Sequence, residues 1–195
     1  MKGYVFVSPG SDPGIGKSLT DPIFGKMTTM GACRPDLRRL VRPGDHLFVI
    51  SGSAKGVSQY IIGGFAVDEK IDALAAHTRF PEYRLKIKDG TKEGNIIIDE
   101  SGRHHPLDHH PESNFERRIQ NYIIGRDPVF LDKPHEILLG RERTLEVLRS
   151  IFDKPGAKRV REVIGRNSGL DEKQIDQLLK ALEEIKAEAA RVQSR

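Results

Sequence analysis

This chain of 195 residues has one cysteine, no long apolar run and only a small net charge. Its single cysteine, Cys33, excludes an intramolecular disulfide and an all-cysteine zinc site, and it fits a reducing compartment. The longest apolar stretches, residues 47–50 and 96–98, are far shorter than the roughly 20 residues of a membrane-spanning helix. The first residues are typical of a strand over 3–7 and not of a secretory leader, so we expect a cytoplasmic protein without a membrane partner.

The charge balance and the apolar content bound the class of protein. The 32 basic and 28 acidic side chains leave a formal charge of +4, which permits an anionic partner but is a weak argument for one. A hydrophobic share of 37% is enough for the core of a folded domain. The length suggests one domain, or one domain with a helical appendage.

The first two thirds of the chain alternate β-prone stretches with turns. The strands expected from these patterns are residues 3–7, 46–50, 60–67, 83–87, 95–98, 120–124 and 128–131. Gly63 and Gly64 indicate a bulge, or the close approach of another backbone or a ligand. Short helices are expected at residues 36–41, after Pro35, and at residues 68–77.

The last third is helical by its spacing of apolar residues. One helix is expected from Glu136 to the Pro155-Gly156 break, and a longer one begins at the capping-box pattern of Asp171 and Gln174. The apolar stripe of the last helix consists of Ile175, Leu178, Leu182, Ile185, Ala189 and Val192. This stripe must pack on the rest of the fold or pair with its copy in a homodimer.

Two motifs suggest phosphate or metal chemistry without meeting its requirements. The glycine–lysine–serine loop of residues 14–18 has Ser11 where a phosphate-binding loop needs glycine, so a flexible loop is favoured over an ATPase. Residues 104–110 contain four histidines, but their spacing matches no closed metal site. A solvated loop is favoured there, with a pH-sensitive phosphate contact left open. We therefore predict no metal and no cofactor.

Catalytic residues are equally hard to assemble. Cys33 has Arg34 beside it, which would lower the pKa of a thiol, but no base is evident and a packed cysteine is the simpler interpretation. Ser51 and Ser53 lack the glycine–serine–glycine elbow of a hydrolase. No acyl-transfer triad emerges.

An arginine-rich approach to a small-residue turn is more informative. Arg34, Arg38, Arg39 and Arg42 precede a strand that opens into Ser51-Gly52-Ser53. Arginines hold phosphates through paired hydrogen bonds, and small turn residues leave room and free amides for a base or a phosphate. A surface turn whose arginines pair with neighbouring aspartates explains the pattern equally well.

The order of these motifs resembles a known family. Residues 12–131 are similar to the second of the nucleotide-modification-associated domain families, which are linked to modified-base systems of bacteria and phages. The matching residues are Asp12, Gly14, Asp21-Pro22, Phe24-Gly25, Thr28 or Thr29, Cys33-Arg34-Pro35, Leu37-Arg38 and Gly44-Asp45. The strand–turn–strand run over 44–67 also resembles the PUA-like superfamily.

These resemblances imply a fold and a pocket. The fold would be α+β, with a PUA-like mixed β-barrel and short helices over residues 1–133 and a helical C-terminal extension over 134–195. The pocket would enclose a base turned out of DNA or RNA. By analogy, its rim would be Ser51, Gly52 and Ser53, its phosphate contacts Arg34, Arg38, Arg39 and Lys55, and its stacking candidates Phe24, Phe48 and Tyr60.

The favoured function is a binding module for DNA, RNA or a modified nucleotide. One alternative is a nucleotide- or base-modifying enzyme in which Cys33, Asp12 or a histidine of the 104–110 loop takes part. Another is an interaction protein that dimerises through its last helix. A helix–turn–helix over residues 159–192 is disfavoured as a groove reader, because residues 171–192 carry six acidic and four basic side chains. Lys158, Arg159 and Arg161 stay open as phosphate contacts.

Overall fold

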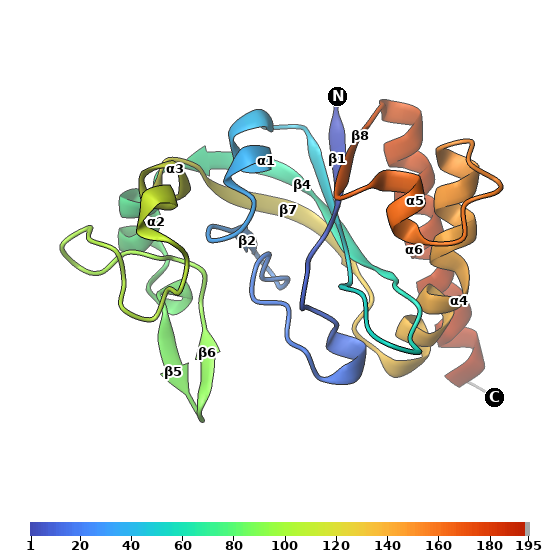
Figure 1. Cartoon of the computed structure of the whole chain (residues 1–195), viewed down its shortest axis with the longest axis horizontal. Coiled ribbons are helices and arrows are strands. Elements are labelled where there is room, and N and C mark those ends of the chain that lie inside the picture. Colours follow the sequence, from blue (N-terminus) through green and yellow to red (C-terminus); the bar gives the residue numbers. More distant parts are fainter. Residues whose placement is uncertain (194–195) are drawn as a thin grey trace. The chain divides into compact units, whose positions relative to one another are not determined.

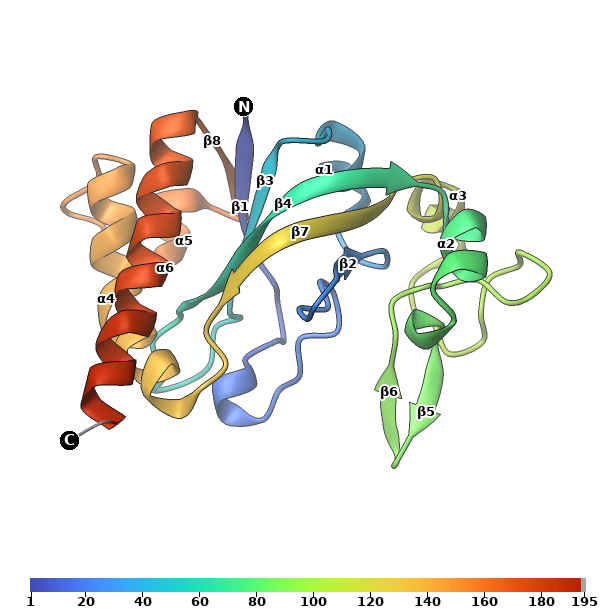
Figure 2. The same cartoon turned by 180° about the vertical axis from the view of Figure 1, so that it is seen from behind.

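The computed structural model describes residues 1–193, and the chain divides into two compact units (Figures 1 and 2). Unit 1 contains residues 1–19, 44–66 and the chain from 127 onward, and unit 2 contains residues 20–43 and 67–126. The sequence predicts two consecutive segments, 1–133 and 134–195, whereas each of these units combines segments that are separate in the sequence. The predicted domain boundary stays a prediction.

A sheet forms the centre of unit 1. Strand β1 (Gly3–Val7) pairs parallel with β3 (His46–Ile50) and antiparallel with β8 (Asn167–Leu170). The strand order is β7-β4-β3-β1-β8, where β4 (Ile61–Ile71) and β7 (Tyr122–Phe130) continue into unit 2. Val5 and Phe6 of β1, residues 47–50 of β3 and residues 61–67 of β4 are buried, as their patterns predict.

The glycine pair of β4 has the predicted role. The register of β3 and β4 shifts between Val49 and Ile50. A Cβ on Gly63 would lie 2.6 Å from the Val129 carbonyl oxygen, and one on Gly64 would lie 2.3 Å from the Phe48 ring. Close approach therefore requires glycine at both positions.

The helices of unit 1 are α4 (Pro134–Ile151), α5 (Val160–Ile164) and α6 (Glu172–Gln193), with α4 and α6 lying side by side (Figure 2). A short 3-10 turn, η1 (Pro13–Ile15), follows β1. The capping box of α6 is confirmed: the Gln174 amide donates to Asp171 Oδ1 at 2.8 Å, and the Asp171 amide donates to Gln174 Oε1 at 3.0 Å.

The apolar stripe of α6 is covered inside the chain. Its first five members, Ile175, Leu178, Leu182, Ile185 and Ala189, are all buried, whereas Val192 is exposed. The stripe therefore packs on the fold, and a homodimer through it is not shown. Between α5 and α6, residues 167–170 form β8, which pairs with β1, in place of the turn of a helix–turn–helix.

Unit 2 combines short strands and helices around a second apolar cluster. Its elements are β2 (Thr28–Met30), α1 (Pro35–Leu40), α2 (Ala73–Arg79), η2 (Pro81–Tyr83), β5 (Lys86–Lys88), β6 (Thr91–Glu93), η3 (Glu112–Asn114) and α3 (Phe115–Ile119). Strand β2 pairs antiparallel with β7. Ile96, Ile97 and Ile98 lie in the core of this unit without forming the predicted strand.

The α+β class is confirmed, whereas the predicted barrel is wrong within residues 1–193. The sheet ends at β8 on one side and at β2 on the other, so it is open. Closure needs a pairing between edge strands, and β8 is a four-residue strand paired only with β1. Among the described helices, none is both long and apolar enough to cross a membrane.

Candidate functional site

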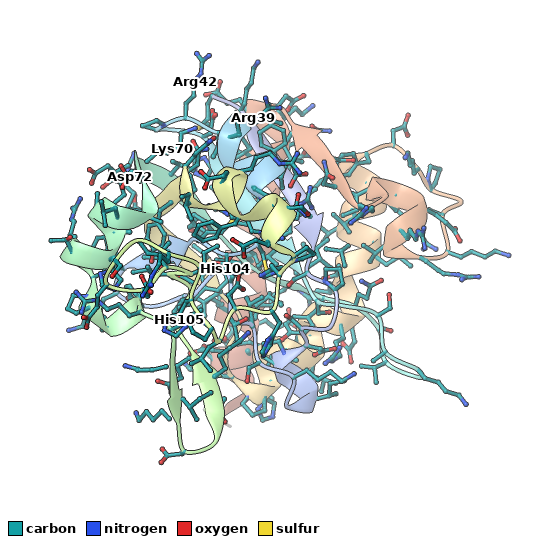
Figure 3. All side chains as sticks on the ribbon, turned by 60° about the vertical axis from the view of Figure 1, so that its left-hand side comes forward. Arg39, Arg42, Lys70, Asp72, His104 and His105 are labelled. Atoms are coloured by element: carbon teal, nitrogen blue, oxygen red, sulfur yellow. The ribbon has the colours of Figure 1, made fainter. Side chains whose placement is uncertain are left out.

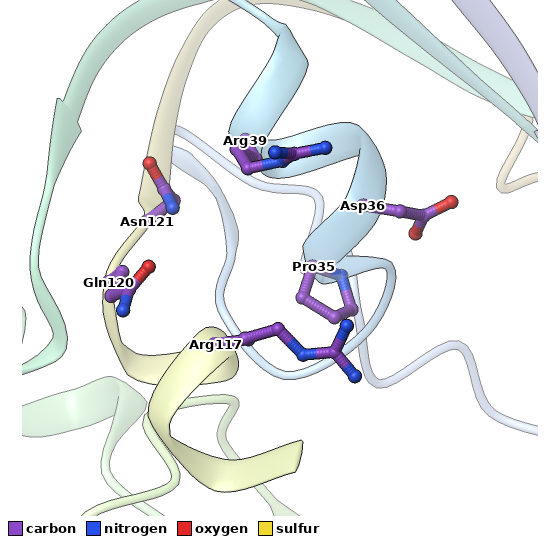
Figure 4. Close-up of a pocket in the computed structure, with 6 residues that line it drawn as sticks. All are labelled: Pro35, Asp36, Arg39, Arg117, Gln120 and Asn121. Atoms are coloured by element: carbon purple, nitrogen blue, oxygen red, sulfur yellow. The ribbon is translucent and has the colours of Figure 1, made fainter.

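A cleft of about 460 Å³ lies in unit 2, where α1 faces the segment from α3 to β7 (Figure 4). Pro35, Asp36 and Arg39 line it from α1. Arg117 lines it from α3, and Gln120 and Asn121 from the residues that lead into β7. Its lining residues therefore include two arginines, two residues with carboxamide side chains, and one aspartate whose carboxylate points away from Gln120 and Asn121 (Figure 4).

Arg38 ties the two walls of this cleft together. Its side chain is fully buried, with Nε donating to the Cys33 carbonyl at 2.8 Å. Its Nη1 donates to the carbonyls of Arg118, at 2.9 Å, and Asn121. Burial lowers the pKa of Arg38 to about 10, opposed by the Asp21 carboxylate, so the group stays charged at neutral pH. Arg38, predicted as a phosphate contact, is thus placed as an internal brace.

The loop before α1 is held by a buried aspartate. Asp21 accepts backbone hydrogen bonds from Gly31 at 2.8 Å, from Ala32 at 3.1 Å and from Cys33. Asn95 donates to the same carboxylate at 2.9 Å. With four N–H donors directed at one carboxylate, the start of α1 has a fixed position.

Arg34 and Arg39 differ in exposure: the Arg34 side chain, at the N-cap of α1, is 17% exposed, whereas Arg39 lies on the exposed face of the helix. Arg34 has a left-handed backbone, φ 52°, and its guanidinium binds the Asp36 carboxylate at 2.6 and 3.0 Å. That hydrogen bond lowers the pKa of Asp36. Arg39 is exposed and lies on the same side of unit 2 as Arg42 and Lys70 (Figure 3). Three basic residues therefore lie on one side of unit 2 (Figure 3).

The two candidate catalytic residues, Cys33 and Asp12, lie in environments typical of structural residues. Burial, reinforced by the Asp21 carboxylate, raises the pKa of Cys33 to about 12, so the thiol is protonated at neutral pH and is a poor nucleophile. Asp12 belongs to unit 1, where Arg141 binds both of its oxygens at 2.6 and 3.1 Å. Neither arrangement favours the enzymatic alternative.

The serine–glycine turn belongs to unit 1, whereas Arg34, Arg38 and Arg39 belong to unit 2. Ser51 is buried, and its hydroxyl accepts from the Tyr60 amide at 3.0 Å. A Cβ on Gly52 would lie 2.7 Å from the Gly10 nitrogen, so this glycine packs against backbone. Ser53 and Lys55 are exposed. A pocket shared by this turn and the arginines stays a prediction.

The stacking candidates have different surroundings. Phe48 and Tyr60 are both fully buried, and Tyr60 packs under the Arg141 guanidinium at 4.8 Å. They therefore fill the core of unit 1. Phe24, in unit 2, is half-buried.

The histidine-rich loop forms a histidine–carboxylate network. His104 Nε2 lies 2.7 Å from Asp108 Oδ2, and its Nδ1 contacts Glu112. His110 Nδ1 lies 2.6 Å from the other oxygen of Asp108. Partial burial lowers the pKa of His104, but the hydrogen bonds to Asp108 and Glu112 outweigh it, and the net pKa is raised. No cluster suited to a metal ion occurs among the residues with described positions.

The cleft includes residues that the sequence argument missed. The residues missed are Arg117, Gln120 and Asn121, which lie more than 75 residues after α1. The sequence pattern predicted only a strand over 120–124. The signal available was the basic pair Arg117-Arg118 next to two amides. Only the fold brings Arg117 and the two amides into the same cleft as Arg39.

Comparisons with known proteins add little. No protein-family model matches the sequence, and no curated protein does. The structure is similar to that of human THYN1 protein in complex with 5-methylcytosine containing DNA, at 12% identity and a TM-score of 0.38, over 94% of this chain and 98% of that chain. Similarity at this level establishes neither a shared family nor a shared function.

Proposed function

We propose that this protein is a nucleic-acid or nucleotide binding module whose unit 2 cleft holds phosphate and a base edge. One observation carries the proposal: guanidinium groups from two separate elements, Arg39 of α1 and Arg117 of α3, line one cleft with the carboxamides of Gln120 and Asn121. The cleft is large enough, at about 460 Å³, to take a nucleotide-sized ligand.

The two arginines suit phosphate. A guanidinium donates two parallel hydrogen bonds to phosphate oxygens and remains charged at any physiological pH. Arg39 and Arg117 are exposed, and no acidic side chain pairs with either of them among residues 1–193. Their charge is thus available to an anion.

The two carboxamides suit a base edge. Asparagine and glutamine each offer one acceptor and two donors, a pattern that pairs with the edge of a base. No aromatic side chain lines the cleft among the described residues. Base contacts there would therefore be hydrogen bonds and not stacking.

Arg38 and Asp21 make the cleft preorganised. Since Arg38 bonds to carbonyls on both walls and Asp21 fixes the entry to α1, little conformational entropy is lost when a ligand binds. Recognition of a modified base by the carboxamides is the finer part of this proposal. Lys55 and Ser53 are further candidate contacts.

Fluorescence anisotropy with labelled DNA and RNA oligonucleotides, with and without 5-methylcytosine, tests the proposal. Arg39→Ala and Arg117→Ala should each weaken binding to all strands about tenfold and lower the salt slope by about 0.7 to 0.9. Asn121→Ala should instead change the base preference. Arg103→Ala, an exposed arginine of unit 2 outside the cleft, is the matched control. Equal affinity in the cleft variants and the control would reject the proposal.

A further inference from the structure

We propose that the exposed basic surface around α5 in unit 1 is a second contact for the phosphate backbone of a nucleic acid. We call residues 154–166 the α5 surface. Five of its thirteen residues are basic and one, Glu162, is acidic. The inference rests on the proposed function, because it assigns to that ligand a contact beyond the cleft.

Most of the charge on the α5 surface has no acidic partner. Glu162 pairs with Arg159 at 3.6 Å, and Lys154 Nζ donates to the uncharged carbonyl of Val163 at 2.6 Å. The side chains of the other three basic residues, Lys158, Arg161 and Arg166, are exposed and make no ion pair with any residue from 1 to 193. Three unpaired cations thus lie on one short segment.

The backbone that carries these cations is firmly anchored. Val160, Val163 and Ile164 are buried beneath the α5 surface. Arg149 Nε donates to the Ala157 carbonyl at 2.5 Å, and the Arg166 carbonyl accepts from the Val7 amide of β1 at 3.1 Å. Since only side-chain freedom is lost on binding, the entropy cost of using these cations is small.

The chemistry favours a soluble polyanion over a membrane. A lipid-binding surface needs large apolar side chains that enter the bilayer interface. None of the exposed large apolar residues of the described chain lies within 154–166. Three fixed cations without apolar neighbours suit the spaced phosphates of a nucleic acid, where each neutralised phosphate releases a counterion.

Helix α6 of the same unit provides control residues for a test of the α5 surface. α6 carries exposed Lys173, Lys180 and Arg191 among six acidic residues of 171–192. Lys180 Nζ, for example, lies 3.8 Å from Glu184. Residues 171–192 carry more acidic than basic side chains, so these three cations serve as a control with the same loss of charge in the same unit.

The test compares two triple variants of the full chain. The α5 variant carries Lys158→Gln, Arg161→Gln and Arg166→Gln. The probe is a labelled single strand of roughly 30 nucleotides, longer than the roughly 4 to 16 nucleotides that one binding groove covers. The α5 variant should bind at least about tenfold more weakly and lower the salt slope by about 2, since each phosphate contributes about 0.7. A phosphorylated dinucleotide, which is shorter than the roughly 4 to 16 nucleotides of one binding groove, should bind unchanged.

The control variant carries Lys173→Gln, Lys180→Gln and Arg191→Gln and should bind both probes as the unmodified protein does. Circular dichroism establishes that both triple variants are folded. If the α5 variant matches the control, the second contact is refuted, while weaker binding by Arg39→Ala still supports the cleft. If the Arg39→Ala variant binds normally and the α5 variant does not, the cleft is refuted instead. Binding to phosphatidylserine vesicles that is lost in the α5 variant, without loss of oligonucleotide binding, would overturn the nucleic-acid partner.

Discussion

Asp21→Asn should destabilise the protein severely, because the replaced oxygen accepts two buried hydrogen bonds. In the native side chain, Oδ1 accepts from Gly31 and Asn95, and Oδ2 accepts from Ala32 and Cys33. An asparagine keeps one oxygen and turns an NH₂ group toward the other two donors. Whichever way the amide is oriented, two N–H groups lose their acceptor.

The expected cost follows from these contacts. A hydrogen bond to a charged group contributes about 1.5–3 kcal/mol, so the loss of two costs roughly 3–6 kcal/mol. A typical domain has only about 5–15 kcal/mol of stability in total. With a urea dependence of about 2 kcal/mol/M, the midpoint of unfolding should fall by roughly 1.5–3 M.

Urea unfolding followed by circular dichroism measures this shift. Asp68→Asn is the control, because Asp68 and its partner Arg126 are both 55% exposed, and a surface ion pair of this kind is worth at most about 1 kcal/mol. A change below about 1 kcal/mol in Asp21→Asn would refute the claim that this carboxylate organises the loop before α1. It would also remove the reason to regard the cleft as preorganised.

Two further predictions concern titratable groups of unit 2. The raised pKa of His104 means that its folded state binds a proton more tightly than the unfolded chain, whose value is near 6.5. The native protein should therefore exceed His104→Gln in free energy of unfolding by the full amount below about pH 6.5, and this difference should fall as the pH rises through the folded pKa. Urea unfolding measured across pH 6 to 9 checks this. A difference that grows with pH would contradict the histidine–carboxylate network. Cys33, with a pKa near 12, should react with iodoacetamide at pH 8 far more slowly in the folded than in the urea-unfolded protein. Comparable rates, measured by mass spectrometry, would show an accessible thiolate.

Local patterns predicted the elements whose apolar faces are simple. The strands at residues 3–7 and 46–50 and the long helix after Asp171 have the predicted type, because apolar periodicity and a capping box are properties of neighbouring residues. Residues 83–87 alternate like a strand, yet they are divided between the η2 turn and β5. Leu85 and Tyr83 pack in the apolar cluster of unit 2, whereas Ile87 is 56% exposed, so packing overrode the local preference.

The candidate site shows the same limit. Arginines near α1 were recognised as phosphate-type residues, but Arg38 is buried as a brace while Arg39 is exposed one position later. On a helix of six residues, adjacent side chains point about 100° apart, so the face toward the core decides which arginine is accessible. Arginine content alone cannot distinguish the two.

Composition and periodicity thus account for the α+β class, the absence of disulfides, the amphipathic last helix and the concentration of arginine before β3. Contacts between distant segments decided the rest. Arg39 meets Arg117, Gln120 and Asn121 only when α1 and α3 pack together, and Asp21 acquires its donors only when the loop before α1 folds around it. A sequence pattern reports neighbours along the chain, whereas a binding site depends on neighbours in space.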